Sequence, residues 1–205
     1  MAVLFLQGPM GPFFRKLITK LRDGGVDAFK INFNGGDAWY SRGIGAVPFM
    51  GAESEWPEFL RNFIHDNGIG SICVYGDCRR YHRAAKVVAD ELGLRFYAFE
   101  EGYIRPNHLT FERNGVNGYS EIEIEGLPEW QDKEIESESV MGGTLMNRAR
   151  YCATYYNVAY LQRLKFPHYQ HHRSFSPLDE AICWMRALAR NYLYKVSELG
   201  IQQRL

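Results

Sequence analysis

The chain has 205 residues, of which 46% are hydrophobic and 23% charged, a composition typical of a globular protein with a sizeable core. Lys and Arg balance Asp and Glu, at 24 each, so the net charge gives no reason to expect nucleic acid as a partner. The first 14 residues lack the basic start and long apolar run of a signal peptide, and no stretch approaches the roughly 20 apolar residues of a membrane span. We therefore expect a cytoplasmic protein that is soluble or peripheral to a membrane.

Strand and helix patterns alternate through the first half of the chain. Apolar runs and period-two patterns predict strands, and apolar residues at helical spacing predict helices. Alternation of this kind is typical of βαβ units with right-handed crossovers. We predict an α/β fold: a Rossmann-like parallel sheet with flanking helices, over residues 1–120. The expected strands are 2–6, 27–34, 71–76 and 94–99, the expected helices are 13–21, 56–67 and 80–93, and a Gly-rich loop spans 34–45.

The pattern changes after residue 106. Residues 109–120 resemble a hairpin that turns at Asn114-Gly115. The segment 121–140 is strongly acidic and is expected to be a solvated linker. In the remainder, 141–205, Lys and Arg outnumber Asp and Glu. The pattern there predicts two helices, at 141–164 and 178–198. Their basic side chains could rest on an anionic membrane face.

The first candidate site follows the first strand. Gln7, Gly8 and Gly11 lie where the strand passes to a helix, and glycines there let backbone amides approach an anionic ligand. The alternative is a tight turn, with Pro12 in the first turn of the helix. Both interpretations stay open at this point.

The second candidate site follows the strand at 71–76, with Asp77, Arg79, Arg80 and His82 close together in sequence. Ligands of open α/β sheets bind beyond the carboxyl ends of the strands, and arginines there could hold a phosphate or carboxylate. The alternative is that Asp77 caps the next helix and the arginines are solvated.

The third candidate site is the acidic pair Glu100 and Glu101, at the end of the last predicted strand. Paired carboxylates can divide the roles of acid and nucleophile in glycosyl chemistry. Neighbours in extended backbone point to opposite faces, so we expect Glu101 to face the cleft and Glu100 to brace the loop. The alternative is that Glu101 pairs with Arg105 in a structural ion pair.

Metal binding receives little support from the sequence. The segment 166–173 contains His168, His171 and His172, without a Cys or carboxylate at ligand spacing. The four cysteines match no zinc or redox spacing either. We expect no metal site and reduced thiols.

Taken together, four segments resemble the capsule polysaccharide biosynthesis and export family, the bacterial β-Kdo transferases of capsule linker synthesis. The resemblance runs from about residue 3 to about residue 198 and depends on the order and spacing of the segments. They are FLQGPMGPFF at 5–14, YGDCRRYHRAA at 75–85, EEGYIRP at 100–106 and FPHYQHHR at 166–173.

The resemblance implies a retaining glycosyltransferase of GT-B type, with two Rossmann-like halves and the active site between them. It implies transfer of the sugar acid Kdo from CMP-Kdo to a lipid-linked acceptor, at the inner face of the inner membrane, with no cofactor. Related transferases carry a Glu-Asp-Gly motif, which corresponds here to Glu100, Glu101 and Gly102, with glutamate in place of the aspartate. Active family members are about twice as long, so this chain resembles their N-terminal half.

The resemblance also suggests roles for the other candidate residues. Glu101 or Glu100 would be the catalytic carboxylate, and Asp77 or His82 the general acid or base. Arg79, Arg80 and Arg105 would hold the Kdo carboxylate or a phosphate. Two alternatives remain open: a non-catalytic half that binds glycan, lipid or a capsule assembly partner, and a nucleotide-binding domain for another sugar.

Overall fold

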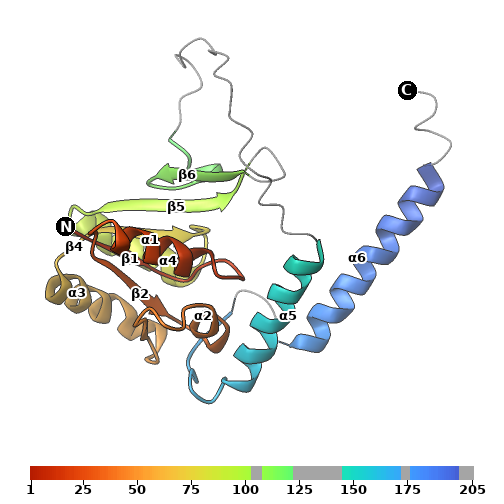
Figure 1. Cartoon of the computed structure of the whole chain (residues 1–205), viewed down its shortest axis with the longest axis horizontal. Helices are drawn as coiled ribbons and strands as arrows, with labels where there is room; N and C mark the ends of the chain where they lie inside the picture. The colour runs from red at the N-terminus through yellow and green to blue at the C-terminus, as the bar shows by residue number, and fades with distance from the viewer. Residues whose placement is uncertain (103–107, 122–144, 172–175, 199–205) are drawn as a thin grey trace, which may run out of the picture. The chain divides into compact units, whose positions relative to one another are not determined.

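The computed structural model covers all 205 residues and describes residues 1–102, 108–121, 145–171 and 176–198. The chain forms two compact units, Met1–His172 and Arg173–Leu205. The first unit contains the sheet and the helices α1 to α5, and the second contains the helix α6 (Figure 1).

A six-stranded sheet forms the centre of the first unit, in the order β3-β2-β1-β4-β5-β6. All neighbours are parallel except β5 and β6, which are antiparallel. This arrangement confirms the predicted Rossmann-like α/β fold. The strands are β1 (Ala2–Phe5), β2 (Ala28–Asn32), β3 (Val47–Pro48), β4 (Ile69–Tyr75), β5 (Arg95–Glu101) and β6 (Leu109–Arg113).

The helices follow the sequence pattern closely in the first half of the chain. α3 and α4 cover the predicted ranges almost entirely, and α6 confirms the helix expected at 178–198. The helices are α1 (Phe13–Asp23), α2 (Gly35–Tyr40), α3 (Trp56–Asn67), α4 (Arg80–Glu91), α5 (Leu145–Leu161) and α6 (Pro177–Glu198), with short 3-10 turns at Glu53–Glu55 and Asn117–Tyr119.

Two apolar cores lie on opposite faces of the sheet. Successive residues of a strand point to opposite faces, so Leu4 packs in the core beneath α3 and α4 while Phe5 packs against α1. Trp56 lies in the first of these cores and donates from its indole nitrogen to the backbone oxygen of Tyr81, 2.9 Å away. The sheet is therefore rigid on both sides, and its carboxyl ends are held in fixed positions.

The region predicted as a Gly-rich loop contains a short helix, α2, against which α5 packs. The side chain of Asn34 caps α2 by accepting from the backbone nitrogen of Asp37. A Cβ atom added to Gly36 would lie 2.6 Å from the backbone oxygen of Tyr155 in α5. The glycines therefore permit close approach of two helices, a role that composition alone does not distinguish from that of a loop.

The predicted hairpin at 109–120 is wrong. β6 pairs with β5, with Ala98 opposite Glu112, and the chain after Asn114 leads into a 3-10 turn. Asn114 has a φ of 69° and donates its backbone N–H to the oxygen of Phe96. The left-handed residue ends the pairing with β5, whereas a hairpin would need a partner strand after it.

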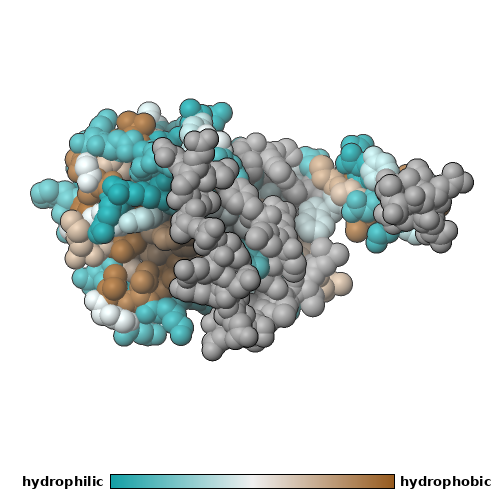
Figure 2. All heavy atoms as spheres, turned by 90° about the horizontal axis from the view of Figure 1, so that it is seen from above, coloured by the Kyte–Doolittle hydropathy of each residue, from teal (hydrophilic) through white to brown (hydrophobic). Residues whose placement is uncertain are grey.

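Apolar surface is exposed along β6, the outer strand of the sheet, where Leu109 and Phe111 are about half exposed. Figure 2 looks onto the side of the molecule where β6 lies in Figure 1, and shows hydrophobic atoms among hydrophilic ones. In the described part of the chain, no helix is both long and apolar enough to cross a membrane. Of the predicted acidic linker, all but the first residue lies outside the described residues.

Candidate functional site

The strand order places a topological switch point between β1 and β4. The chain leaves β1 through α1 to β2 on one side, whereas β4 lies on the other side of β1. Crevices at the carboxyl ends of such strands are where open α/β sheets bind ligands. The loop after β1 and the loop after β4 meet there, and they carry two of the three candidate sites.

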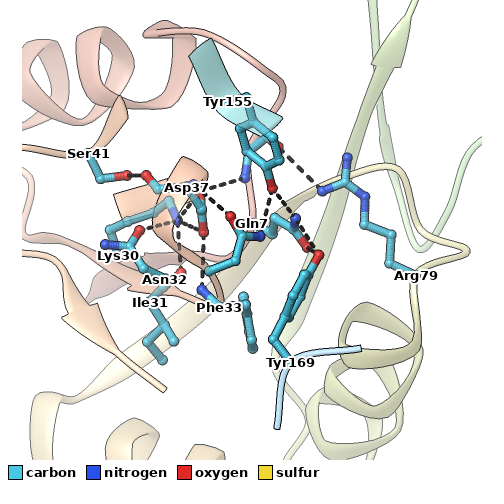
Figure 3. A network of polar contacts seen from close by, with 12 residues as sticks. Gln7, Lys30, Ile31, Asn32, Phe33, Asp37, Ser41, Arg79, Tyr155 and Tyr169 are labelled. Carbon is cyan, nitrogen blue, oxygen red and sulfur yellow. Dashed lines mark hydrogen bonds and ion pairs between the residues drawn. The ribbon is translucent and has the colours of Figure 1, made fainter. Parts of the chain in front are cut away.

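The loop after β1 is held by side chains from distant parts of the chain. Gln7 is buried, and its Nε2 donates to the hydroxyl of Tyr155 at 2.6 Å and to that of Tyr169 at 3.0 Å. The backbone N–H of Gly8 points at Oδ1 of Asp37, 3.4 Å away. Figure 3 shows these groups converging on the β1 end from α2, α5 and the segment after α5. The loop is therefore fixed before any ligand arrives.

A buried ion pair lies under this loop. Lys30 Nζ is 2.9 Å from Asp37 Oδ2, and both side chains are almost wholly inaccessible. Nζ also donates to the side-chain oxygen of Asn32 and the backbone oxygen of Ile31. Burial lowers the pKa of Lys30, and the carboxylate of Asp37 opposes that shift. The pair stabilises the position of Asp37, which in turn holds Gly8.

Tyr155 lies at the centre of the same network. Its hydroxyl accepts from Gln7 and from Asn34 Nδ2, the latter at 2.7 Å. Burial raises its pKa well above 10, so the hydroxyl keeps its proton. Tyr169 stacks on Tyr81 with ring centroids 5.9 Å apart and also contacts His171 Nδ1 at 2.9 Å.

Arg79 crosses the switch point. Its Nη1 donates to the backbone oxygen of Gly8, 3.3 Å away, and the side chain is half-buried. Burial lowers the pKa of His82, and the charge of Arg79 lowers it further. Burial raises the pKa values of Tyr75 and Tyr155, and the charge of Arg79 opposes that rise. Among the described residues no carboxylate forms an ion pair with Arg79. Arg79 therefore offers a positive charge at the place where a ligand would bind.

Its neighbour Arg80 lies elsewhere. The side chain of Arg80 is exposed and contacts Glu53 at 3.4 Å and Gln170 at 3.0 Å. The structure thus separates the two arginines that are adjacent in sequence.

His82 is completely buried in α4, below the loop after β4. Its Nδ1 contacts the backbone oxygen of Gly76. Burial, with the charges of Arg79 and Lys30, lowers the pKa of His82 well below 6.5. The ring is therefore neutral, with its proton on Nδ1 facing the carbonyl, and among the described residues Nε2 has no partner.

Asp77 does not cap α4, and that alternative is wrong. The N-cap residue is Arg79, without a side-chain cap. Asp77 Oδ2 instead accepts from the backbone nitrogen of Val116 at 2.8 Å, and Oδ1 accepts from Cys78 Sγ at 3.2 Å. The hydrogen bond to Asp77 raises the pKa of Cys78, and burial adds to the shift. Asp77 thus ties the loop after β4 to the segment after β6.

Both glutamates belong to β5, which extends two residues beyond the predicted strand. By alternation Glu100 shares the face of Ala98, and Glu101 shares that of Phe99. Glu100 Oε1 accepts from the backbone nitrogen of Glu101. Its Oε2 lies beside Gly76, 3.6 Å from where a Cβ atom on that residue would sit, with Nε of Arg79 3.9 Å from the same point.

The two glutamates thus occupy different surroundings. Glu100 is partly buried next to the loop that carries Arg79, whereas Glu101 is exposed. Burial, reinforced by both carboxylates, raises the pKa of Tyr75 to about 12. Gly102 donates its N–H to the oxygen of His108 at 2.8 Å, and a Cβ atom there would collide with that oxygen. Arg105 and His172 lie outside the described residues.

We use the name switch-point cluster for Gln7, Gly8, Arg79, Glu100 and Tyr155. The structure brings the three segments together as the strand pattern predicts, with Gly11 set back against Tyr151.

The sequence reasoning missed Lys30, Asn34, Asp37, Tyr155 and Tyr169. A lysine between Phe29 and Ile31 in an apolar strand was the available signal, because a charge in a buried strand needs a partner. In the described part of the chain, no three His, Cys, Asp or Glu residues gather as metal ligands would.

Comparison with known proteins adds a family. The model of the family described as "Capsule polysaccharide biosynthesis protein" matches residues 70–203. The capsule polysaccharide export protein KpsS of Escherichia coli is 39% identical over 207 residues, which cover 98% of this chain and 52% of that protein. The capsule polysaccharide modification protein LipB of Neisseria meningitidis serogroup A is 32% identical over 211 residues, which cover 99% of this chain and 50% of that protein. The chain spans about half the length of these relatives, and no solved structure matches it.

Proposed function

We propose that this chain, which belongs to the capsule polysaccharide biosynthesis protein family, supplies one half of a glycosyltransferase that transfers Kdo from CMP-Kdo to a lipid-linked acceptor. The reaction would take place at the cytoplasmic face of the inner membrane, with peripheral contact to the lipid. The chain would work together with a second half of the kind its longer relatives contain.

One observation carries the proposal: the guanidinium of Arg79 lies at the switch point without a carboxylate partner among the described residues. A nucleotide sugar of this kind carries a phosphate on the nucleotide and a carboxylate on the Kdo. A planar guanidinium can bind either group through two parallel hydrogen bonds. The rigid support from Gln7 and Gly8 means that little order has to be created on binding.

Glu100 supports the chemical half of the proposal. Kdo transfer passes through a cationic sugar centre, which a nearby carboxylate stabilises or attacks. From the sequence we expected Glu101 to face the cleft, but Glu100 lies next to the loop that carries Arg79 and Glu101 is exposed. We therefore assign Glu100 the catalytic carboxylate, and Glu101 the outer position nearer solvent. Asp77 and His82 are both buried and would support the loop after β4. Either would need a change of conformation to take part in proton transfer, and both remain candidates for that role.

The experiment follows radiolabelled Kdo from CMP-Kdo into a lipid acceptor, using this chain mixed with the second half of a family member expressed separately. Label in the lipid supports transfer. The proposal fails when no label reaches the lipid although the same second half is active as part of its own full-length protein.

A non-catalytic function is the second candidate, because the chain spans about half the length of its relatives. In that case it would bind a glycan, a lipid or a capsule assembly partner. Glu100→Gln and Glu101→Gln distinguish the two functions. A transferase loses turnover with at least one of them while its fold survives, and a binding protein keeps its function with both.

A further inference from the structure

A hollow of about 420 Å³ lies at the carboxyl ends of β2 and β3. That volume is in the range of small-molecule sites. We call it the β2–α5 pocket. Its polar side chains are Asn32, Ser41, Arg42, Gln162 and Lys165, and its aromatic ones are Trp39 and Phe166.

Arg42 is held in place on the pocket wall. Its guanidinium carbon lies 3.2 Å from the centre of the Trp39 ring, and its Nε donates to the backbone oxygen of Trp39 at 3.1 Å. In the described part of the chain the two terminal nitrogens have no acceptor. Stacking fixes the plane of the guanidinium and leaves its outer edge for a bidentate contact.

Asn32 supplies a hydrogen-bond donor on the pocket wall. The residue is only 4% exposed, and its side-chain oxygen accepts from Lys30 Nζ at 2.9 Å. The amide nitrogen at the other end of the group has no partner among the described residues, and Asn32 lines the pocket. Because Asn32 lines the pocket, this nitrogen can donate to a ligand oxygen there.

Lys165 adds a second positive charge from the segment after α5. Among the described residues its ammonium forms no ion pair, and no Asp or Glu lines the pocket. Gly35 lies in tight contact with Gln162 beside the pocket, since a Cβ atom on Gly35 would be 2.6 Å from Cβ of Gln162. Among the described residues, a hollow lined by two cations and an amide donor, with no carboxylate, favours an anion.

We propose that the β2–α5 pocket binds the carboxylate or phosphate group of a polar ligand, at a site separate from the switch-point cluster. Anion binding here does not depend on the proposed function. Only the further step, that this ligand is the lipid-linked acceptor of the proposed transfer, rests on the proposed function. Hydrogen bonds join the two sites, from Asn32 to Lys30, then to Asp37 and to the backbone of Gly8 (Figure 3).

The chain offers a matched control for Arg42. Arg163 also stacks on the aromatic residue three positions earlier, with its guanidinium carbon 4.5 Å from the ring centre of Tyr160, but it does not line the pocket. Arg42→Gln and Arg163→Gln therefore remove the same kind of stacking and the same charge. Both side chains are exposed, so both variants should fold.

The test titrates the chain with free Kdo and with glycerol 3-phosphate, following the side-chain amide signals of Asn32 by NMR. We expect one probe to bind, and Arg42→Gln to weaken it by about tenfold or more, with Arg163→Gln unchanged. Tighter binding of Kdo assigns a carboxylate, and tighter binding of glycerol 3-phosphate assigns a phosphate. The proposal is overturned when neither probe shifts the Asn32 signals, or when the two variants bind equally well.

A second titration separates this proposal from the proposed function. CMP binding at the switch-point cluster should be unchanged in Arg42→Gln. Kdo or glycerol 3-phosphate binding that survives in a chain unable to bind CMP would leave the pocket proposal standing while the transferase proposal fails.

Discussion

Arg79 donates a hydrogen bond from Nη1 to the backbone oxygen of Gly8, 3.3 Å away, and so joins the loops after β4 and β1 across the switch point. The two residues are 71 positions apart. The contact uses one of the five N–H groups of the guanidinium. Within the part of the chain that the structure describes, the others have no acceptor and are available to an anion.

Replacing Arg79 should weaken binding of the nucleotide. Arg79→Gln removes the charge and should raise the Kd for CMP by about tenfold to a hundredfold, the usual effect of losing hydrogen bonds to a charged group. Isothermal titration calorimetry measures the change. Arg61→Gln is the control, because Arg61 pairs with Glu91 on the exposed side of α3. Equal Kd values for CMP in the wild type and in Arg79→Gln would mean that Arg79 does not bind the nucleotide.

The buried ion pair predicts a large stability effect. Lys30→Met leaves the carboxylate of Asp37 buried without its cation, which should cost about 3–5 kcal/mol in the free energy of unfolding. Urea denaturation followed by circular dichroism gives that value. Lys16→Met, a change at an exposed position of α1, should alter it little. A cost for Lys30→Met as small as that of the control would mean that the pair does not hold Asp37.

Because α2 and α5 are in close contact, adding a single methyl group at Gly36 should lower the stability of the fold. Gly36→Ala would place its Cβ atom 2.6 Å from the backbone oxygen of Tyr155, so α5 must shift, at a cost of about 1–3 kcal/mol. Gly118→Ala is the matched control, since a Cβ atom there meets no described residue within 4 Å. Thermal unfolding compares the two variants. The packing of α5 on α2 would be contradicted by Gly36→Ala unfolding at the same temperature as Gly118→Ala.

His82 predicts a dependence of stability on pH. Its pKa in the folded chain lies well below 6.5, so below about pH 6.5 the unfolded chain binds a proton that the folded chain does not. The stability contributed by neutral His82 is therefore present above pH 6.5 and is lost as the pH falls below it, by up to about 1.4 kcal/mol per pH unit.

The comparison with His82→Gln isolates this contribution, because the glutamine amide can still donate to the oxygen of Gly76. Denaturation from pH 7 to pH 5 should show a smaller loss of stability in the variant than in the wild type. His65→Gln, at a position 90% exposed, should follow the wild type. Identical pH profiles for His82→Gln and wild type would mean that His82 titrates as freely when folded as when unfolded.

Local patterns predicted the parallel part of the sheet well, for a physical reason. β1, β2, β4 and β5 consist mostly of apolar residues, and each covering helix has apolar residues on one face, so burial can be read along the chain. β3, a half-buried pair of residues, was not predicted, because Val47–Pro48 is too short to give a strand pattern. The three strand-end motifs were located in the same way, since βαβ topology brings all carboxyl ends to one edge.

Long-range pairing could not be predicted from those patterns. Gln7 meets Tyr155 and Tyr169 across 148 and 162 positions, and no periodicity signals such a contact. The Asn114-Gly115 pair favoured a hairpin, but the pairing of β6 with β5 overrode that local preference. Gly35 and Gly36 were assigned to a loop because the close approach of α5, which requires them, is a tertiary contact.

The most direct measurement is Kdo transfer with the two glutamates changed one at a time. Radiolabelled Kdo from CMP-Kdo is followed into a lipid acceptor, with this chain mixed with the second half of a family member. Label should reach the lipid with the wild type and with Glu58→Gln, an exposed change on α3. With Glu100→Gln it should fall by about a hundredfold or more, while the thermal stability stays the same. Unchanged transfer by Glu100→Gln would contradict the assignment of the catalytic carboxylate, and no transfer by the wild type would contradict the account as a whole.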